Sequence, residues 1–309
     1  MKVYSSLENL IGNTPIVRLN KLEKELGLSA KLYAKLEMFN PAGSVKDRAS
    51  LYMINDAEKK GVIKKGATII EPTSGNTGIG IAFISAIRGY RAVFTMPNTM
   101  SEERIKILKA YGAEVVLTDG ALGMQGAIDK AIEIHKKTPN SFIPSQFSNP
   151  ANLDAHYVVT GKEIYEDLEG NIDFFVAGIG TGATVSGVGR YLKEKIDGVK
   201  IVGVEPLSSP LITKGFFSAH KIQGIGANFI PENFDKNAVD EVVAVSDEDA
   251  KDFTNKLAKV EGILAGISSG ASLVAGVNIA KIKENQGRSV VVLFPDTGMR
   301  YLSTDLFGE

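Results

Sequence analysis

Short apolar segments alternate with amphipathic segments along most of the chain, and this alternation restricts the possible folds more than any other feature. The apolar segments have the length and composition of strands: Lys31–Glu37, Thr68–Glu71, Arg91–Met96, Glu114–Thr118, Asp173–Ala177, Lys200–Glu205, Val242–Ser246 and Ser289–Phe294. Helical patterns lie between many of them: Glu102–Tyr111, Ala121–Lys137, Ala183–Lys195 and Asp247–Val260. Ser246, followed by three acidic residues, is typical of a helix N-cap. The pattern predicts an α/β fold with mostly parallel sheets flanked by helices.

The length of 309 residues predicts about two domains. A boundary is expected in the segment 144–152, where two prolines and two asparagines oppose regular structure. A division there gives two α/β lobes, and the cleft between such lobes is the expected ligand site.

The charge balance and the cysteine count exclude several classes of function. There are 35 basic and 36 acidic side chains, so nucleic acid and anionic membranes are not expected partners. No cysteine is present, which excludes disulfides, thiolate metal sites and a cysteine nucleophile. The three histidines are scattered, and we expect no metal site. The first nine residues lack an apolar signal segment, so a cytoplasmic location is expected.

Three stretches contain no charged side chain: Pro72–Ile87, Phe174–Gly189 and Gly262–Ala280. They are too rich in glycine, serine and threonine for membrane spans. Each has a loop of small residues that opens a predicted helix; the last of these helices is expected over Ala271–Lys281. Such loops expose backbone N–H groups at the positive end of the helix dipole, which suits anions.

The second of these loops allows an alternative interpretation. Gly178, Gly180 and Ala183 match the dinucleotide pattern G-x-G-x-x-A, and Glu205 ends the next predicted strand. This loop alone therefore leaves a nicotinamide-dependent enzyme open.

Lys46 lies where the loop of Asn40–Arg48 enters a predicted helix. Small and apolar neighbours and the helix N-terminus both disfavour a charged amine, so we expect a lowered pKa. A neutral lysine amine attacks carbonyl groups, and this is the arrangement of pyridoxal phosphate enzymes.

The ordered set of motifs resembles the cysteine synthase (O-acetylserine sulfhydrylase) family of fold-type II pyridoxal phosphate enzymes, whose fold is like that of the tryptophan synthase β-subunit. The nicotinamide interpretation explains only one of these motifs. The resemblance implies two lobes with twisted, mostly parallel sheets: a smaller, mobile domain of residues 40–149, and a larger domain of residues 1–39 and 150–309 that carries the phosphate loop. Its motifs run from Ile11–Pro15 to Pro295–Gly298 and include Asn40–Arg48, Thr73–Gly78, Met100–Ser101, Gln146–Phe147, Asn149–Asn152, Gly178–Thr184, His220–Gly226 and Gly266–Ala271.

The resemblance also implies a role for each motif. Lys46 is expected to bind the cofactor pyridoxal 5'-phosphate covalently and to act as the catalytic base. Asn76 is expected to bind the 3′ oxygen of the cofactor, and Ser268 its ring nitrogen. The expected phosphate ligands are Gly178, Gly180, Thr181, Gly182 and Thr184, and the expected substrate-carboxylate ligands are Thr73, Ser74, Thr77 and Gln146.

The reaction implied is β-replacement, in which O-acetyl-L-serine and sulfide give L-cysteine and acetate through an α-aminoacrylate intermediate. The alternatives within the family are a cysteine lyase that releases hydrogen sulfide, and a β-synthase that forms lanthionine or cystathionine. Asn228 stands where the family often has glycine, and it is a candidate for the residue that determines which nucleophile or leaving group is accepted. A homodimer is expected, and the C-terminal tail of serine acetyltransferase is an expected partner.

Overall fold

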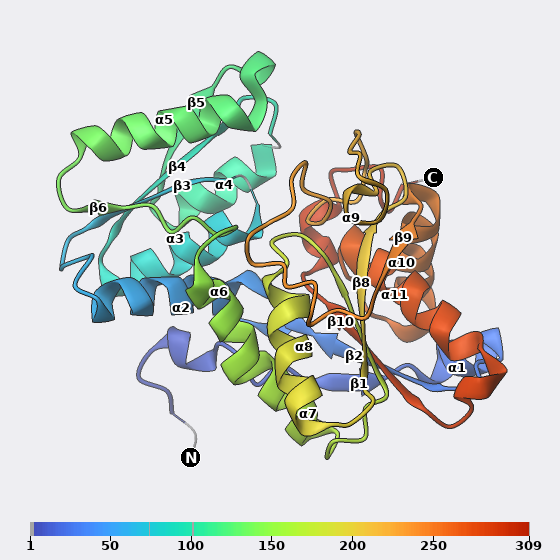
Figure 1. Cartoon of the computed structure of the whole chain (residues 1–309). Helices are drawn as coiled ribbons and strands as arrows, with labels where there is room; N and C mark the ends of the chain where they lie inside the picture. The colour runs from blue at the N-terminus through green and yellow to red at the C-terminus, as the bar shows by residue number, and fades with distance from the viewer. Residues whose placement is uncertain (1–2, 74, 101, 309) are drawn as a thin grey trace. The chain divides into compact units, whose positions relative to one another are not determined.

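A computed structural model describes residues 3–73, 75–100 and 102–308 (Figure 1). The chain forms two compact units. Unit 1 consists of Met1–Ile11 and Asn40–Asn152, and unit 2 of Gly12–Phe39 and Leu153–Glu309. The division into a mobile and a larger domain stays a prediction.

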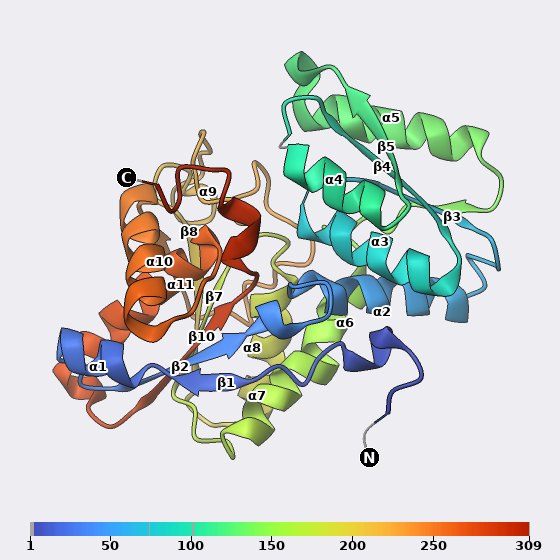
Figure 2. The ribbon, with the colours of Figure 1, turned by 180° about the vertical axis from the view of Figure 1, so that it is seen from behind.

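Unit 1 is built on a parallel sheet of four strands in the order β5-β4-β3-β6. Its strands are β3 (Thr68–Pro72), β4 (Arg91–Pro97), β5 (Glu114–Thr118) and β6 (Ser141–Phe142). Its helices are α2 (Lys46–Lys59), α3 (Asn76–Arg88), α4 (Glu102–Ala110) and α5 (Gly123–Lys137). The chain steps outward from β3 to β5 and then returns to β6. Because crossover connections are right-handed, α3 and α4 cover one face and α5 covers the other (Figure 2).

Unit 2 contains a sheet of six strands in the order β1-β2-β10-β7-β8-β9. Only the pair of β1 and β2 is antiparallel among these strands. The strands are β1 (Ile16–Arg18), β2 (Lys31–Leu36), β7 (Phe174–Gly178), β8 (Lys200–Pro206), β9 (Glu241–Val245) and β10 (Ser289–Phe294). The helices are α1 (Asn20–Leu26), α7 (Lys162–Asp167), α8 (Ala183–Lys195), α9 (Leu211–Lys214), α10 (Asp247–Glu261) and α11 (Ile267–Lys281).

Two further helical segments follow one another in the sequence between β6 and β7. The helix α6 (Pro150–Ala155) continues into a π-helix over His156–Gly161. Short 3-10 turns occur at Leu7–Leu10, Glu37–Phe39, Gly120–Leu122, Lys283–Asn285 and Gly298–Tyr301.

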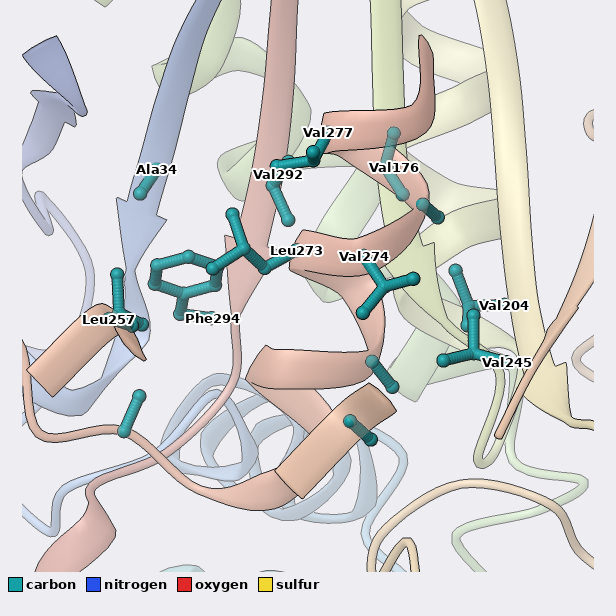
Figure 3. Close-up of a cluster of buried hydrophobic side chains, with 14 of the residues drawn as sticks. Ala34, Val176, Val204, Val245, Leu257, Leu273, Val274, Val277, Val292 and Phe294 are labelled. Atoms are coloured by element: carbon teal, nitrogen blue, oxygen red, sulfur yellow. The ribbon is translucent and has the colours of Figure 1, made fainter. Parts of the chain in front are cut away.

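The core of unit 2 lies between its sheet and α11. Figure 3 shows Leu273 beside Phe294 and Val277 beside Val292, and all four side chains are fully buried. The helix α10 packs on the outer side of α11. This enclosure explains why α11 is apolar almost all round and is still not a membrane span.

Both sheets contain a point at which the chain order reverses: between β3 and β6 in unit 1, and between β7 and β10 in unit 2. The loops that leave neighbouring strands at such a point diverge to opposite faces and leave room for a ligand at the carboxyl edge of the sheet. The chain leaves β3 after Pro72 toward α3, and the loop 179–182 leaves β7 toward α8.

The predicted α/β fold is confirmed, and apart from the start of α11 every predicted strand and helix is present within two residues of its expected ends. Ser246 is an N-cap, since its hydroxyl accepts a hydrogen bond from the N–H of Asp249 at 3.0 Å. The predicted linker 144–152 is partly wrong, because Pro150 begins α6; proline suits the first turn of a helix, where its missing N–H costs nothing. The last glycine-rich loop is also shorter than predicted, because Gly266 caps α11 and the helix begins at Ile267.

Across the described residues, no helix combines the length and the apolar character that crossing a membrane requires.

Candidate functional site

Lys46 is the first residue of α2, as the sequence predicts. The loop before it is closed by hydrogen bonds to its own backbone. Asp47 accepts from the N–H of Ala42 at 2.6 Å, and the hydroxyl of Ser44 accepts from the N–H of Lys46 at 3.2 Å. The side chain of Lys46 is half-buried. A single amine is thus held at the positive end of a helix of 14 residues.

The predicted carboxylate loop joins β3 to α3 in the same unit. Thr73 is buried, and its hydroxyl accepts from the N–H of Gly75 at 3.1 Å. Asn76 and Thr77 open α3, so their backbone N–H groups lie in its first turn. Ser74 lies outside the described residues. The start of this helix suits a carboxylate.

Gln146 meets this loop from a segment about 70 residues away in the sequence. Its Oε1 accepts a hydrogen bond from the hydroxyl of Thr77 at 2.5 Å, and both side chains are buried. The contact follows from the sheet order: β6 pairs with β3, so the chain leaving β6 passes the loop that leaves β3. Two of the predicted carboxylate ligands are thereby brought together.

A buried acid that was not predicted from the sequence, Glu71, binds the backbone beside Gln146. Glu71 on β3 accepts from the N–H of Ser145 at 3.0 Å and from the N–H of Gln146 at 3.2 Å. Burial raises the pKa of the Glu71 carboxyl from 4.5 to about 7, and the two N–H groups act in the opposite direction. The available signal was a lone acid inside an otherwise apolar strand.

In unit 2, the predicted phosphate loop runs from the end of β7 into α8. Gly182 has a φ of +77°, which favours glycine, and it caps α8. Gly180 has no space for a side chain, because a Cβ there would lie 2.3 Å from the carbonyl oxygen of Gly224. The loop leads directly into the N-terminus of α8, a helix of 13 residues. A glycine-rich loop followed by a helix N-terminus binds phosphate in many proteins.

Thr184, in the first turn of α8, lies within hydrogen-bond distance of His156. Nε2 of His156 lies 3.2 Å from the hydroxyl oxygen of Thr184, and Nδ1 lies 3.0 Å from that of Thr160. His156 is fully buried in the π-helix, a type of turn common at functional sites. Nothing in the sequence near His156 indicated this contact.

Ser268 lies in the first turn of α11 and is buried. Gly266, the N-cap, donates its N–H to the carbonyl oxygen of Asp296 at 3.2 Å, which fixes the entry to the helix. The group offered here is a neutral hydroxyl.

Glu205, the acid that a nicotinamide-binding site would need for the ribose, is engaged in other hydrogen bonds. The carboxylate of Glu205 accepts from the N–H groups of Ile212 at 2.8 Å and Thr213 at 3.1 Å, and so caps α9. It does not present free oxygens to a ribose. In the described part of the chain there is also no cluster of acidic or histidine side chains suited to a metal ion.

Comparison with known proteins decides the family. The sequence model described as "Pyridoxal-phosphate dependent enzyme" matches residues 7–296. The chain belongs to this family of pyridoxal-phosphate dependent enzymes. The resemblance noted in the sequence, the fold class and the cofactor are thereby confirmed.

Members of the pyridoxal-phosphate dependent enzyme family match over the full length. The cysteine synthase of Staphylococcus aureus is 49% identical over 307 residues, covering 99% of this chain and 98% of that protein. A crystal structure of cysteine synthase from Entamoeba histolytica has a TM-score of 0.96 at 43% identity, covering 100% of this chain and 92% of that one. A hydrogen sulfide-producing enzyme from Fusobacterium nucleatum has a TM-score of 0.93 at 44% identity, covering 98% and 99%.

The residues present fit pyridoxal phosphate, the cofactor of this family of enzymes. Within unit 1, Lys46 has an amine of the kind that reacts with an aldehyde, and Asn76 has a side-chain amide at the start of α3. Within unit 2, the glycine-rich start of α8 is of a kind that binds phosphate, and Ser268 has a buried neutral hydroxyl. The close approach of Gly180 to Gly224 supports the phosphate assignment most strongly. The loop has no room for a side chain there, so only its backbone can face a ligand.

Proposed function

We propose that this chain is a cysteine synthase, which converts O-acetyl-L-serine and sulfide to L-cysteine and acetate by β-replacement. The observation that carries this proposal is the similarity to a cysteine synthase at 49% identity over nearly the whole of both chains. The amine at the start of α2 and the two loops at the reversal points supply the matching chemistry.

When bound, pyridoxal phosphate supplies an electron sink conjugated to the α-carbon of the substrate. In our proposal Lys46 holds the cofactor through its amine and takes the proton from that carbon. Gly178, Gly180, Thr181, Gly182 and Thr184 bind the phosphate through backbone N–H groups and hydroxyls, and Asn76 binds the 3′ oxygen.

The substrate carboxylate is assigned to Thr73, Ser74, Thr77 and Gln146, at the start of α3. A carboxylate in this place gains from the helix dipole and from charge-assisted hydrogen bonds. It also orients the α-carbon, so that the acetate leaves along a fixed direction.

Ser268 sets the course of the reaction in this proposal. A neutral hydroxyl at the ring nitrogen does not keep the ring protonated as a carboxylate would. The weaker electron sink favours loss of a β-leaving group over racemisation or transamination.

The reaction is tested by mixing the purified enzyme with O-acetylserine and sulfide and measuring L-cysteine. Lys46→Ala should abolish turnover, whereas Lys59→Ala, at the exposed end of the same helix, should retain it. Unchanged turnover in Lys46→Ala would contradict the assignment of the catalytic amine.

A cysteine lyase that releases hydrogen sulfide is a second candidate, favoured by the similarity to the enzyme of Fusobacterium nucleatum. The two candidates differ in their preferred amino acid. Sulfide release from L-cysteine that is faster than cysteine formation from O-acetylserine would favour the lyase. A β-synthase that forms lanthionine or cystathionine would accept an amino-acid thiol in place of sulfide.

We further propose a homodimer in the cytoplasm that binds the C-terminal tail of serine acetyltransferase. The support is the full-length similarity to cysteine synthases. Light scattering of the purified protein measures the dimer. A peptide with the sequence of that tail should compete with O-acetylserine, and addition of the amino acid should release it.

A further inference from the structure

Gln146 is held by hydrogen bonds at both its backbone and its side chain. Its N–H donates to Glu71 at 3.2 Å, and its carbonyl oxygen accepts from Nδ2 of Asn152 at 2.8 Å. Its side-chain oxygen accepts from Thr77. The three partners come from a strand, from the start of α6 and from the start of α3. Hydrogen bonds therefore restrict both the backbone and the side chain of Gln146.

Glu71 is the strand residue among these three partners. It is 2% exposed, and among the described residues its carboxylate bonds only to two backbone N–H groups in succession. A buried carboxylate is costly unless its oxygens are satisfied, and within the described part of the chain no cation pairs with it. The two N–H groups lower this cost, so the buried carboxylate and the turn that supplies these groups stabilise each other.

The turn that Glu71 binds has an unusual backbone. Ser145 has a φ of +57°, a conformation that residues other than glycine, asparagine and aspartate rarely adopt. Such a conformation points successive N–H groups toward one side, where they bind an anion. It persists only when its surroundings fix it. The two oxygens of Glu71 contribute to this constraint, together with the N–H groups of Ser148 and Asn149, which both donate to the carbonyl oxygen of Ser145 at 3.0 Å. Gln146 is the next residue.

The direction of the Gln146 side-chain amide follows from its hydrogen bond to Thr77. Because Oε1 accepts from Thr77, the –NH2 end of the planar amide lies on the other side. A carboxylate accepts hydrogen bonds from an amide –NH2 group, whereas the amide oxygen in the same position would repel the carboxylate. The loop of Thr73 to Thr77 is the assigned carboxylate site.

We propose that Glu71 is a positioning residue of the substrate site, which fixes the turn at Ser145 so that the Gln146 amide directs its donor end to the carboxylate of the amino-acid substrate. This inference rests on the proposed function for the identity of the ligand, an α-amino acid. Glu71 acts through Gln146 and does not touch the substrate.

The first test is Glu71→Gln. The amide that replaces the carboxylate accepts one N–H but opposes the other with its own donors, so the turn loses a charge-assisted hydrogen bond. We expect KM for O-acetylserine at about pH 8, where the wild-type carboxyl is ionised, to rise about tenfold with kcat nearly unchanged, because the lost charge-assisted hydrogen bond no longer fixes the turn. The control is Glu261→Gln, which removes a glutamate that accepts the N–H of Leu22 at 2.8 Å in unit 2. KM should not change in the control.

The decisive test is a double-mutant cycle. If Glu71 acts through Gln146, then Glu71→Gln should change KM little further once Gln146→Ala has removed the amide. Equal effects of Glu71→Gln with and without that amide would overturn the proposal. A loss confined to kcat would overturn it too.

A second variant covers the case in which Glu71→Gln does not fold. Asn152→Ala releases the carbonyl oxygen of Gln146 instead of its N–H, and it should raise KM in the same way. An unchanged KM in a folded Asn152→Ala would count against the constraint on Gln146.

Amino-acid binding is also measured directly, from the absorption of the bound cofactor during titration with O-acetylserine, L-serine and L-cysteine. Because all three carry the same α-carboxylate, Glu71→Gln should weaken all three by a similar factor. A wild-type enzyme that binds amino acids but makes no cysteine would refute the proposed function and leave this inference standing. Effects that differ among the three would refute the inference alone.

Discussion

Replacing Glu71 by glutamine should change the way in which the free energy of unfolding depends on pH. Burial raises the pKa of the carboxyl from 4.5 to about 7 in the folded chain. Below pH 4.5 the folded and the unfolded states are both protonated, and the carboxyl costs nothing. Between pH 4.5 and 7 the unfolded state releases the proton while the folded state keeps it. Stability is therefore lost as the pH rises through this window, and above it the loss is constant.

The size of the loss follows from the pKa. At about 1.4 kcal/mol per pH unit, a rise from 4.5 to about 7 corresponds to about 3 kcal/mol. Glutamine does not ionise, so the difference in unfolding free energy between the two proteins isolates this group. All other titrating side chains cancel in that difference.

The measurement is urea denaturation of both holoenzymes, followed by circular dichroism, at intervals from about pH 4.5 to about pH 8. The advantage of the wild type over Glu71→Gln should shrink by up to about 3 kcal/mol as the pH rises. A difference that does not vary with pH would mean that the carboxyl titrates equally in both states. A difference that grows with pH would mean that the two N–H groups outweigh burial, and it would refute the reasoning.

Three further substitutions test other parts of the structure. Gly180→Ala should weaken the binding of pyridoxal phosphate more than about tenfold, since the new Cβ meets the backbone of Gly224; equilibrium dialysis measures this, with Gly308→Ala, in open space, as the control. Lys35→Met should lower the unfolding free energy by about 1.5–3 kcal/mol, because the buried ammonium no longer donates to Glu163, Asp167 and the carbonyl oxygen of Thr14; Lys60→Met, at an exposed ion pair, should cost less than about 1 kcal/mol in the same denaturation experiment. Leu273→Ala should cost about 2–5 kcal/mol through the cavity it leaves against Phe294, whereas Leu302→Ala, at an exposed site, should be nearly neutral; equal costs at the two sites would contradict the packing described for α11.

The sequence predicted the elements that have a strong local pattern. Ser289–Phe294 is a buried parallel strand with three valines in succession, and Ala183–Lys195 follows a glycine-rich helix start. The strands β1 and β6 were missed, because three and two residues are too few to show a period. Their existence depends on pairing with β2 and β3, which no local pattern reports.

The candidate site divides in the same way. Glycine-rich loops are visible in the sequence because they require glycine itself, as Gly180 and Gly182 show. Contacts that depend on strand order are not visible. His156 meets Thr184 across two helical segments, and Glu71 meets Gln146 only because β6 adds to the edge of β3.

The short strand β6 therefore has more importance for function than its two residues suggest. It pairs with β3 through Thr68 and Ile69, and it thereby brings the turn at Ser145 level with Glu71, at the end of β3. If the register slipped by one residue, the side chains of the turn would exchange faces, and Glu71 would lose both N–H partners. The edge pairing brings together the buried acid and the turn with positive φ, each of which is costly alone. That mutual dependence explains why a carboxylate, rather than an apolar side chain, stands in the interior of this sheet.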